Sequence, residues 1–204
     1  MNFAAHWDGV FQTKAPNEVS WYRPHLDLSL DLIQRCAANV SASIIDVGAG
    51  ESTLVDDLLA AGYEQLTVLD VSRTAIEATK ERLQGMADRV RWLVGDVTQL
   101  SLPCQSFDVW HDRAVFHFLV DEDERRRYVQ AVLHGVRLGG HVIVSTFGPD
   151  GPAKCSGLDV RRYDAQSLHR EFGKRFTIEE SARELHRTPW GADQQFTYCC
   201  CKVE

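Results

Sequence analysis

The residues best suited to chemistry lie between Ile44 and Ser52, where the sequence reads I-I-D-V-G-A-G-E-S. An apolar run leads into Asp46, two glycines follow at Gly48 and Gly50, and a helical pattern begins at once. This order of buried strand, glycine turn and helix start brings backbone N–H groups close to a small bound molecule. The dinucleotide-binding pattern requires a third glycine near Ser52, so the motif by itself does not identify the ligand.

Aspartates recur at the ends of the predicted strands. Each of the first four strands ends in, or just before, one of Asp46, Asp70, Asp96 and Asp112. In an open parallel sheet, ligands bind outside the carboxyl ends of the strands, near the point where the strand order reverses. Asp70 follows Asp46 by 24 residues, close to the ~20 typical of an acid that accepts hydrogen bonds from ribose hydroxyls. One such aspartate is usually a helix N-cap, but four in register indicate a common ligand site.

Strands and helices alternate through the middle of the chain, and this order must position the four aspartates. Apolar runs predict strands over 44–46, 66–70, 90–94, 107–111 and 140–146, and helical patterns cover 52–61, 73–86 and 122–136. The alternation predicts a parallel sheet with helices on both faces. After it we expect a glycine- and proline-rich loop over 148–160, a short helix over 164–172, and strands over 176–181 and 195–203 joined by a long connection.

Length and composition narrow the classes of function. A chain of 204 residues has the size of one domain. A net charge of −7 argues against a nucleic-acid partner, since the phosphate backbone favours basic surfaces. We find neither an apolar run near the ~20 residues of a membrane helix nor a signal peptide. The six cysteines form no disulfide framework, so we expect a reducing cytoplasm and no membrane partner.

Four motifs together resemble the class I S-adenosylmethionine-dependent methyltransferases, of the small, single-domain bacterial type. They are Asp46–Gly50, Leu69–Ser72, Gly95–Val97 and Leu138–Gly140. The resemblance implies a Rossmann-like α/β fold with a doubly wound, seven-stranded sheet that is mostly parallel, with an antiparallel strand pair at the C-terminal end. It also implies S-adenosyl-L-methionine as the cofactor and S-adenosyl-L-homocysteine as its product.

The resemblance divides residues 1–204, taken as one methyltransferase domain, into three parts. Residues 1–42 form an N-terminal cap segment, 43–146 a cofactor-binding core, and 147–204 an acceptor loop and the final strands. It assigns the methionine part of the cofactor to the glycine loop, the ribose to Asp70, the adenine to Asp96, and the sulfonium side to His111 and Asp112. The full cofactor set is Trp21, Asp46, Gly48, Ala49, Gly50, Ser52, Asp70, Val71, Ser72, Asp96, Val97, His111 and Asp112.

Methyl transfer from a sulfonium is an in-line displacement, so the enzyme mainly aligns nucleophile, methyl group and sulfur. No catalytic triad or metal is needed, and we expect no metal site. His117 is our candidate for a catalytic residue near the methyl group, although a buried structural histidine explains the same position. With Tyr22, Arg113 and Cys155, it forms the expected acceptor-side set. Cation–π contact from Trp21 and Tyr22 with the sulfonium is worth roughly 0.5–2 kcal/mol.

Three successive cysteines, Cys199 to Cys201, lie in the last predicted strand. Neighbouring side chains on a strand point to opposite faces, so these three cannot converge on one metal ion. We interpret them as small core residues.

The sequence leaves the acceptor open. The first hypothesis is a small-molecule acceptor in a closed pocket covered by the N-terminal segment, and a monomer or homodimer. The second is a protein-lysine methyltransferase with an open acidic groove, since Asp112–Phe116 (D-R-A-V-F) is similar to the D-K-G-T-F stretch of one lysine-modifying branch. The third is a cofactor-binding module without catalysis, whose acceptor side would be filled or blocked.

Overall fold

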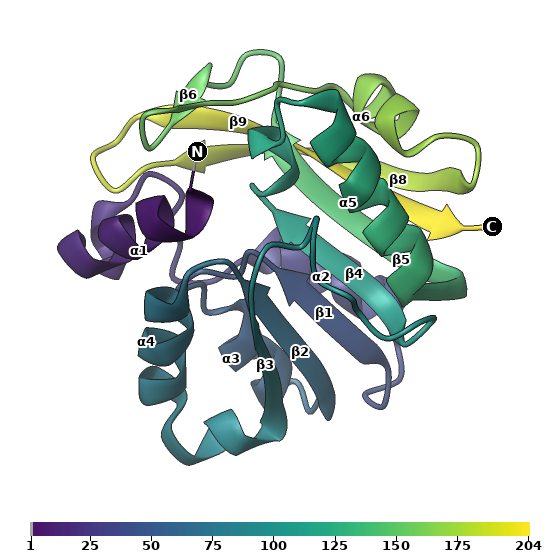
Figure 1. Cartoon of the computed structure of the whole chain (residues 1–204), viewed down its shortest axis with the longest axis horizontal. Helices are drawn as coiled ribbons and strands as arrows, with labels where there is room; N and C mark the ends of the chain where they lie inside the picture. Colours follow the sequence, from purple (N-terminus) through teal and green to yellow (C-terminus); the bar gives the residue numbers. More distant parts are fainter. Residues whose placement is uncertain (1) are drawn as a thin grey trace.

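The computed structural model describes residues 2–204, and these contain a seven-stranded sheet of order β3-β2-β1-β4-β5-β9-β8 (Figure 1). The strands are β1 (Ser43–Val47), β2 (Gln65–Asp70), β3 (Val90–Val94), β4 (Phe107–Arg113), β5 (Val136–Phe147), β8 (Phe176–Arg187) and β9 (Asp193–Val203). The first five pair in parallel, while β9 pairs antiparallel with both β5 and β8. The predicted doubly wound sheet with a terminal antiparallel pair is confirmed.

Helices cover both faces of the sheet, as a parallel sheet requires. They are α1 (Phe3–Thr13), α2 (Asp27–Cys36), α3 (Leu54–Ala60), α4 (Arg73–Leu83), α5 (Glu122–Gly135) and α6 (Ala165–Phe172), with 3₁₀ turns η1 (Pro16–Glu18), η2 (Gln84–Arg89) and η3 (Phe116–Phe118). The buried apolar side chains of α2, α3 and α4 belong to one hydrophobic cluster, and those of α5 and α6 belong to another. None of the helices in residues 2–204 has both the length and the apolar composition of a membrane-spanning segment.

Successive strand residues alternate between the two clusters. Ile44 and Val109 belong to the cluster with α2 and α3, whereas Ile45 and Trp110 belong to the cluster with α5. The cysteine run follows the same rule: Cys200 packs on one face, and Cys199 and Cys201 pack on the other. The expected divergence of the three thiols is therefore confirmed.

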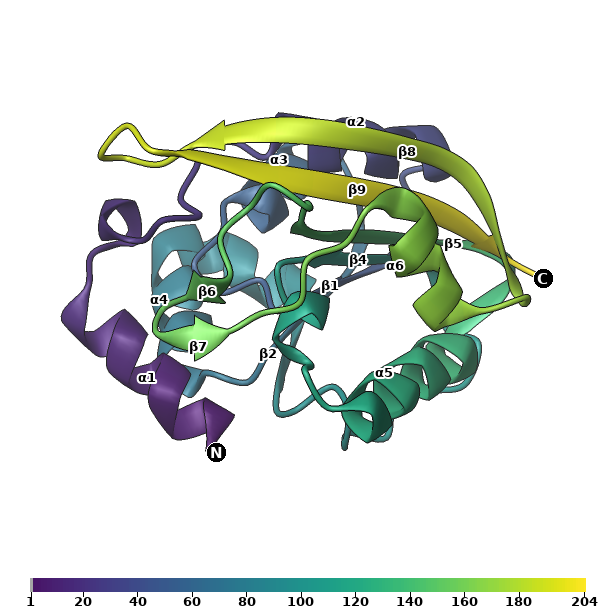
Figure 2. The same ribbon diagram turned by 90° about the horizontal axis from the view of Figure 1, so that it is seen from above.

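The last two strands differ from the prediction. Instead of two short strands with a long connection, β8 and β9 form a long hairpin along one edge of the sheet (Figure 2), joined by residues 188–192. A hydrogen bond from the Thr188 N–H to the Ala192 carbonyl, at 2.8 Å, closes the turn. The missed part of β8 lies at the edge of the sheet and reads A-R-E-L-H-R. Only Ala182 and Leu185 in it are apolar, so no apolar run marks it as a strand.

A buried hydroxyl links β4 to α5. The Trp110 Nε1–H donates to the Tyr128 hydroxyl at 2.9 Å, and that hydroxyl donates to Asp112 Oδ2 at 2.5 Å. All three side chains are almost fully buried. Tyr128 therefore satisfies two polar groups that water cannot reach.

We predict that Tyr128→Phe lowers the free energy of unfolding by about 1–3 kcal/mol, because the buried Trp110 N–H loses its partner and the buried Asp112 carboxylate loses one of its three donors. Urea denaturation followed by circular dichroism measures the change. Tyr22→Phe is the matched control, since the Tyr22 hydroxyl has no hydrogen bond to residues 2–204. An equal loss in both variants would contradict the role given to the Tyr128 hydroxyl.

Candidate functional site

One cavity lies at the carboxyl ends of β1, β2 and β4, and the N-terminal segment before β1 forms its opposite wall. Most residues of the expected site border it: Trp21, Tyr22, Asp46, Gly48, Ala49, Gly50, Ser52, Asp70, Val71, Asp96, Val97, His111, Arg113 and Cys155. Ser72, Asp112 and His117 do not. The glycine loop and the strand-end acids therefore face the same space as the aromatic residues from the start of the chain.

The turn after β1 requires its glycines. Gly48 has φ +66°, and a Cβ placed there would lie 1.8 Å from Cγ2 of Val115. Gly50 has φ +55° and lies under the ring of Phe11 from α1. Larger residues at these positions would strain the backbone and meet a neighbouring side chain. The turn therefore keeps its backbone open to a ligand on the cavity side.

Asp70, at the end of β2, holds two backbone turns together. Its Oδ2 accepts from the Gly50 N–H and its Oδ1 from the Ser72 N–H, both at 2.7 Å. Burial raises the pKa of Asp70 to about 6, against the opposing effect of these two hydrogen bonds. Each carboxylate oxygen has a second lone pair, so Asp70 can still accept from the hydroxyls of a ribose in the cavity.

Asp46, at the end of β1, is held by a buried polar chain. His111 Nδ1 lies 2.7 Å from Asp46 Oδ1, and His111 Nε2 lies 2.9 Å from the Ser29 hydroxyl. Because an ionised carboxylate only accepts, His111 donates to Asp46 through Nδ1, and Nε2 shares a hydrogen bond with the Ser29 hydroxyl. Asp46 Oδ2 has no hydrogen bond to residues 2–204 and is free to accept from an ammonium group.

This aspartate, histidine and serine have the order of a hydrolase triad, but their placement differs. A triad serine must present its oxygen to a substrate. Ser29 is fully buried on α2 and does not border the cavity. The hydrogen bonds among these three residues therefore orient the Asp46 carboxylate, and Ser29 is not a nucleophile.

Asp96, after β3, is held by its own loop. Its Oδ1 accepts from the N–H and the hydroxyl of Thr98, at 2.8 and 2.7 Å, and its Oδ2 accepts from Gln99 at 2.7 Å. Asp96, Val97 and Thr98 all border the cavity. The carboxylate of Asp96 beside an apolar residue suits adenine, a flat ring whose amino group can donate a hydrogen bond.

Two residues of the expected cofactor set lie elsewhere. The expected role of Asp112 beside the sulfonium is wrong, because its carboxylate points into the core. There it accepts from the N–H groups of Val115 and Phe116, at 2.8 and 3.1 Å, and from Tyr128. Ser72 caps α4 through a hydrogen bond from the Ala75 N–H, at 3.2 Å, and does not reach the cavity.

The expected role of His117 near the transferred methyl group is also wrong. Its ring is fully buried between Phe118 and Phe147, with centroids 4.4 and 4.7 Å away, and its Nδ1 accepts from the Phe147 N–H at 3.2 Å. Burial, helped by nearby Arg113, lowers the pKa of His117 to about 3. It is a neutral structural residue, the alternative that the sequence left open.

The sequence did not single out the residues of α1 that border the cavity. Trp7 packs edge-on against Trp21 and Phe118, with centroids 5.7 and 5.1 Å away. Asp8 attaches α1 to α4: it accepts from the Ser72 hydroxyl at 2.6 Å and the Thr74 N–H at 3.0 Å. These hydrogen bonds lower the pKa of Asp8. A tryptophan followed by an aspartate within a helix is no known motif, so only the aromatic character of the N-terminal segment was a signal.

Comparison with known proteins gives three findings. Residues 44–140 match a family model described as a methyltransferase domain. The "eEF1A lysine and N-terminal methyltransferase" of Bos taurus is 30% identical over 121 residues, which span 59% of this chain and only 17% of that protein. A solved structure from work on the conversion of a disulfide bond into a thioacetal group during echinomycin biosynthesis has a TM-score of 0.76 at 18% identity, over 99% of this chain and 92% of that one.

A second solved structure was determined with ligands. The Burkholderia thailandensis 1,6-didemethyltoxoflavin-N1-methyltransferase, with bound 1,6-didemethyltoxoflavin and S-adenosylhomocysteine, has a TM-score of 0.69 at 20% identity. The match covers 99% of this chain and 85% of that chain. The two solved structures share the fold of this chain along almost its whole length.

The pKa of Asp70 predicts how cofactor affinity depends on pH. If ribose hydroxyls donate to the ionised carboxylate, protonated Asp70 must lose its proton before the ligand binds. Since the pKa of Asp70 is about 6, the Kd for S-adenosylhomocysteine should be constant above pH 7 and rise about tenfold at pH 5. Calorimetric titration at several pH values measures this.

Asp70→Asn is the control for this titration, because it keeps the size of the side chain and removes its charge. The variant should bind more weakly and show no change of slope near pH 6. A wild-type Kd that stays constant from pH 7.5 to pH 5 would contradict the ionised role of Asp70.

Proposed function

The chain belongs to the class I S-adenosylmethionine-dependent methyltransferases, and on that premise we propose that it methylates a small molecule bound beside the cofactor. The observation that carries the proposal is the apolar and aromatic wall that the N-terminal segment adds to the cavity. This wall comes from the segment before β1, through Phe3, Trp7, Val19, Trp21, Tyr22 and Leu26. A wall of this kind favours a small acceptor with an apolar body.

The residues of the cavity have separate tasks in this proposal. The cofactor supplies an activated methyl group on a sulfonium. Asp46 Oδ2 accepts from its amino group, Asp70 holds its ribose and Asp96 its adenine. The aromatic ring of Trp21 borders the same cavity and favours a cation over its face. These contacts fix the methyl group, and the N-terminal wall fixes the acceptor in line with it.

The residues near the acceptor do not act as a general base in this proposal. Both ring nitrogens of His111 are engaged, and His117 lies outside the cavity. Burial raises the pKa of the Cys155 thiol to about 11, so it stays protonated at neutral pH. The arrangement suits an acceptor whose nucleophilic atom needs no deprotonation by the enzyme.

The second candidate is a protein methyltransferase. The bovine relative is named for lysine and N-terminal methylation, although the shared stretch is a small part of that protein. The apolar and aromatic N-terminal wall favours the small acceptor over this candidate, for which we expect an open acidic groove. Arg113 also borders the cavity, and a lysine ammonium would meet a like charge there.

We predict that the full chain transfers a radiolabelled methyl group from S-adenosylmethionine into the low-mass fraction of a cell extract separated by ultrafiltration. Asp70→Ala should reduce the transfer strongly, because the cofactor loses a buried acceptor. Scintillation counting of the two fractions, with S-adenosylhomocysteine as inhibitor, measures the result. Label only in the protein fraction would support the second candidate. Normal cofactor binding without transfer to either fraction would support a non-catalytic module.

A further inference from the structure

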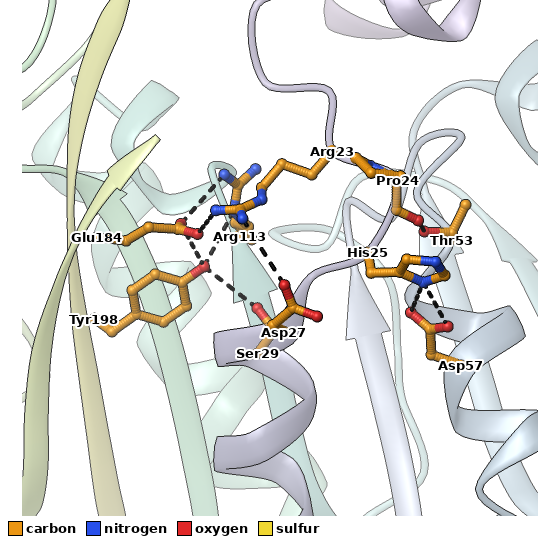
Figure 3. A network of polar contacts seen from close by, with 10 residues as sticks. All are labelled: Arg23, Pro24, His25, Asp27, Ser29, Thr53, Asp57, Arg113, Glu184 and Tyr198. Atoms are coloured by element: carbon orange, nitrogen blue, oxygen red, sulfur yellow. Dashed lines mark hydrogen bonds and ion pairs between the residues drawn. The ribbon is translucent and has the colours of Figure 1, made fainter. Parts of the chain in front are cut away.

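Arg113, the last residue of β4, is a buried cation at the acceptor side of the cavity. Its side chain is only 5% exposed, and it borders the cavity. Its Nε donates to the Tyr198 hydroxyl at 3.1 Å, and its Nη1 donates to the Trp21 carbonyl at 3.2 Å. The guanidinium lies over the ring of Phe196, 4.3 Å from its centroid. These contacts from β9 and from the segment before α2 fix the orientation of the guanidinium. Figure 3 shows the contact with Tyr198.

The hydrogen bonds of Arg113 are incomplete. A guanidinium has five N–H groups. Three of them have partners in residues 2–204. Two are the hydrogen bonds to Tyr198 and Trp21, and the third is a long contact of 3.5 Å from Nη2 to Glu184 Oε2. Two N–H groups, one on each terminal nitrogen, have no partner in residues 2–204. Burying such donors without a partner is costly, so their position at a cavity points to an acceptor group on a ligand.

The charges around Arg113 also favour an anion. Glu184 on β8 does not border the cavity, and its side chain is only 10% exposed. It is shared by two arginines that do border the cavity: Oε1 contacts Arg23, while Oε2 faces Arg113 and Tyr198 (Figure 3). Asp27 lies 3.8 Å from Arg23, but its side chain is 79% exposed, so water screens its charge. One buried carboxylate thus faces two guanidinium groups, which leaves an excess of positive charge in the wall.

Most other residues of this wall are apolar or aromatic. A ligand that fits it must therefore have an apolar body as well as a negative charge. On the basis of the proposed function, we propose that the acceptor is a compact apolar molecule bearing one carboxylate, and that Arg113 binds this carboxylate. Two free N–H groups on one planar guanidinium match the two oxygens of a carboxylate. A phosphate, with three terminal oxygens and more charge, would leave acceptors without donors. Arg113 is therefore a specificity-determining residue.

The test uses carboxylates and their uncharged amides as probes. Benzoate and indole-3-acetate are compared with benzamide and indole-3-acetamide, each titrated into the full chain saturated with S-adenosylhomocysteine. We expect at least one carboxylate to bind tenfold or more tightly than its amide. Arg113→Gln should abolish this preference, and Arg113→Lys should retain part of it. Arg187→Gln, at an exposed arginine at the end of β8, is the control and should keep the full preference.

A second variant is expected to increase carboxylate affinity, so its effect cannot be explained by a loss of folding. Glu184→Gln removes the negative charge that competes for Arg113, so it should increase carboxylate affinity severalfold while the amides bind as before. Equal binding of carboxylates and amides, or a preference that survives Arg113→Gln, would overturn the inference. Wild-type protein that fails to bind S-adenosylhomocysteine would instead overturn the proposed function, so the two failures are distinguishable.

Discussion

The structure depends on the burial of carboxylates at the ends of parallel strands. A carboxylate removed from water must be hydrogen-bonded, or it destabilises the fold. Asp70 is satisfied by the backbone N–H groups of Gly50 and Ser72, so one side chain fixes the turns after β1 and β2 together. Asp112 does the same for the turn after β4 through Val115 and Phe116. The acids that shape the site also hold its scaffold.

The two ends of the cavity are connected by a buried polar chain. It begins at Asp46, passes through His111 and Ser29, and reaches Tyr198, whose hydroxyl lies 3.4 Å from Ser29. Tyr198 then contacts the pair of Arg113 and Glu184 (Figure 3). The chain crosses from β1 to the final hairpin. The C-terminal strands therefore do more than complete the sheet: they orient Arg113, which borders the cavity.

The sequence predicts which residues of the glycine turn and the strand ends border the cavity, because the constraints there are local. A glycine with positive φ and an acid after an apolar run can be read within a few residues, as for Gly48 and Asp70. The acceptor side depends on distant partners. Arg113 meets Glu184 across 71 residues, and Asp112 turns inward because Tyr128 offers a hydroxyl one helix away. The orientation of His117 likewise depends on a later strand, through Phe147. No spacing in the sequence could reveal these choices.

The central claim is that this cavity binds S-adenosylmethionine through the strand-end acids, and calorimetric titration with S-adenosylhomocysteine at neutral pH tests it most directly. The account predicts one site per chain, with binding weakened about tenfold to a hundredfold in Asp70→Ala, as expected for the loss of about 1.5–3 kcal/mol of hydrogen bonds to a charged group. Folded wild-type protein without binding heat at any temperature tested, or equal affinity in wild type and variant, would contradict it.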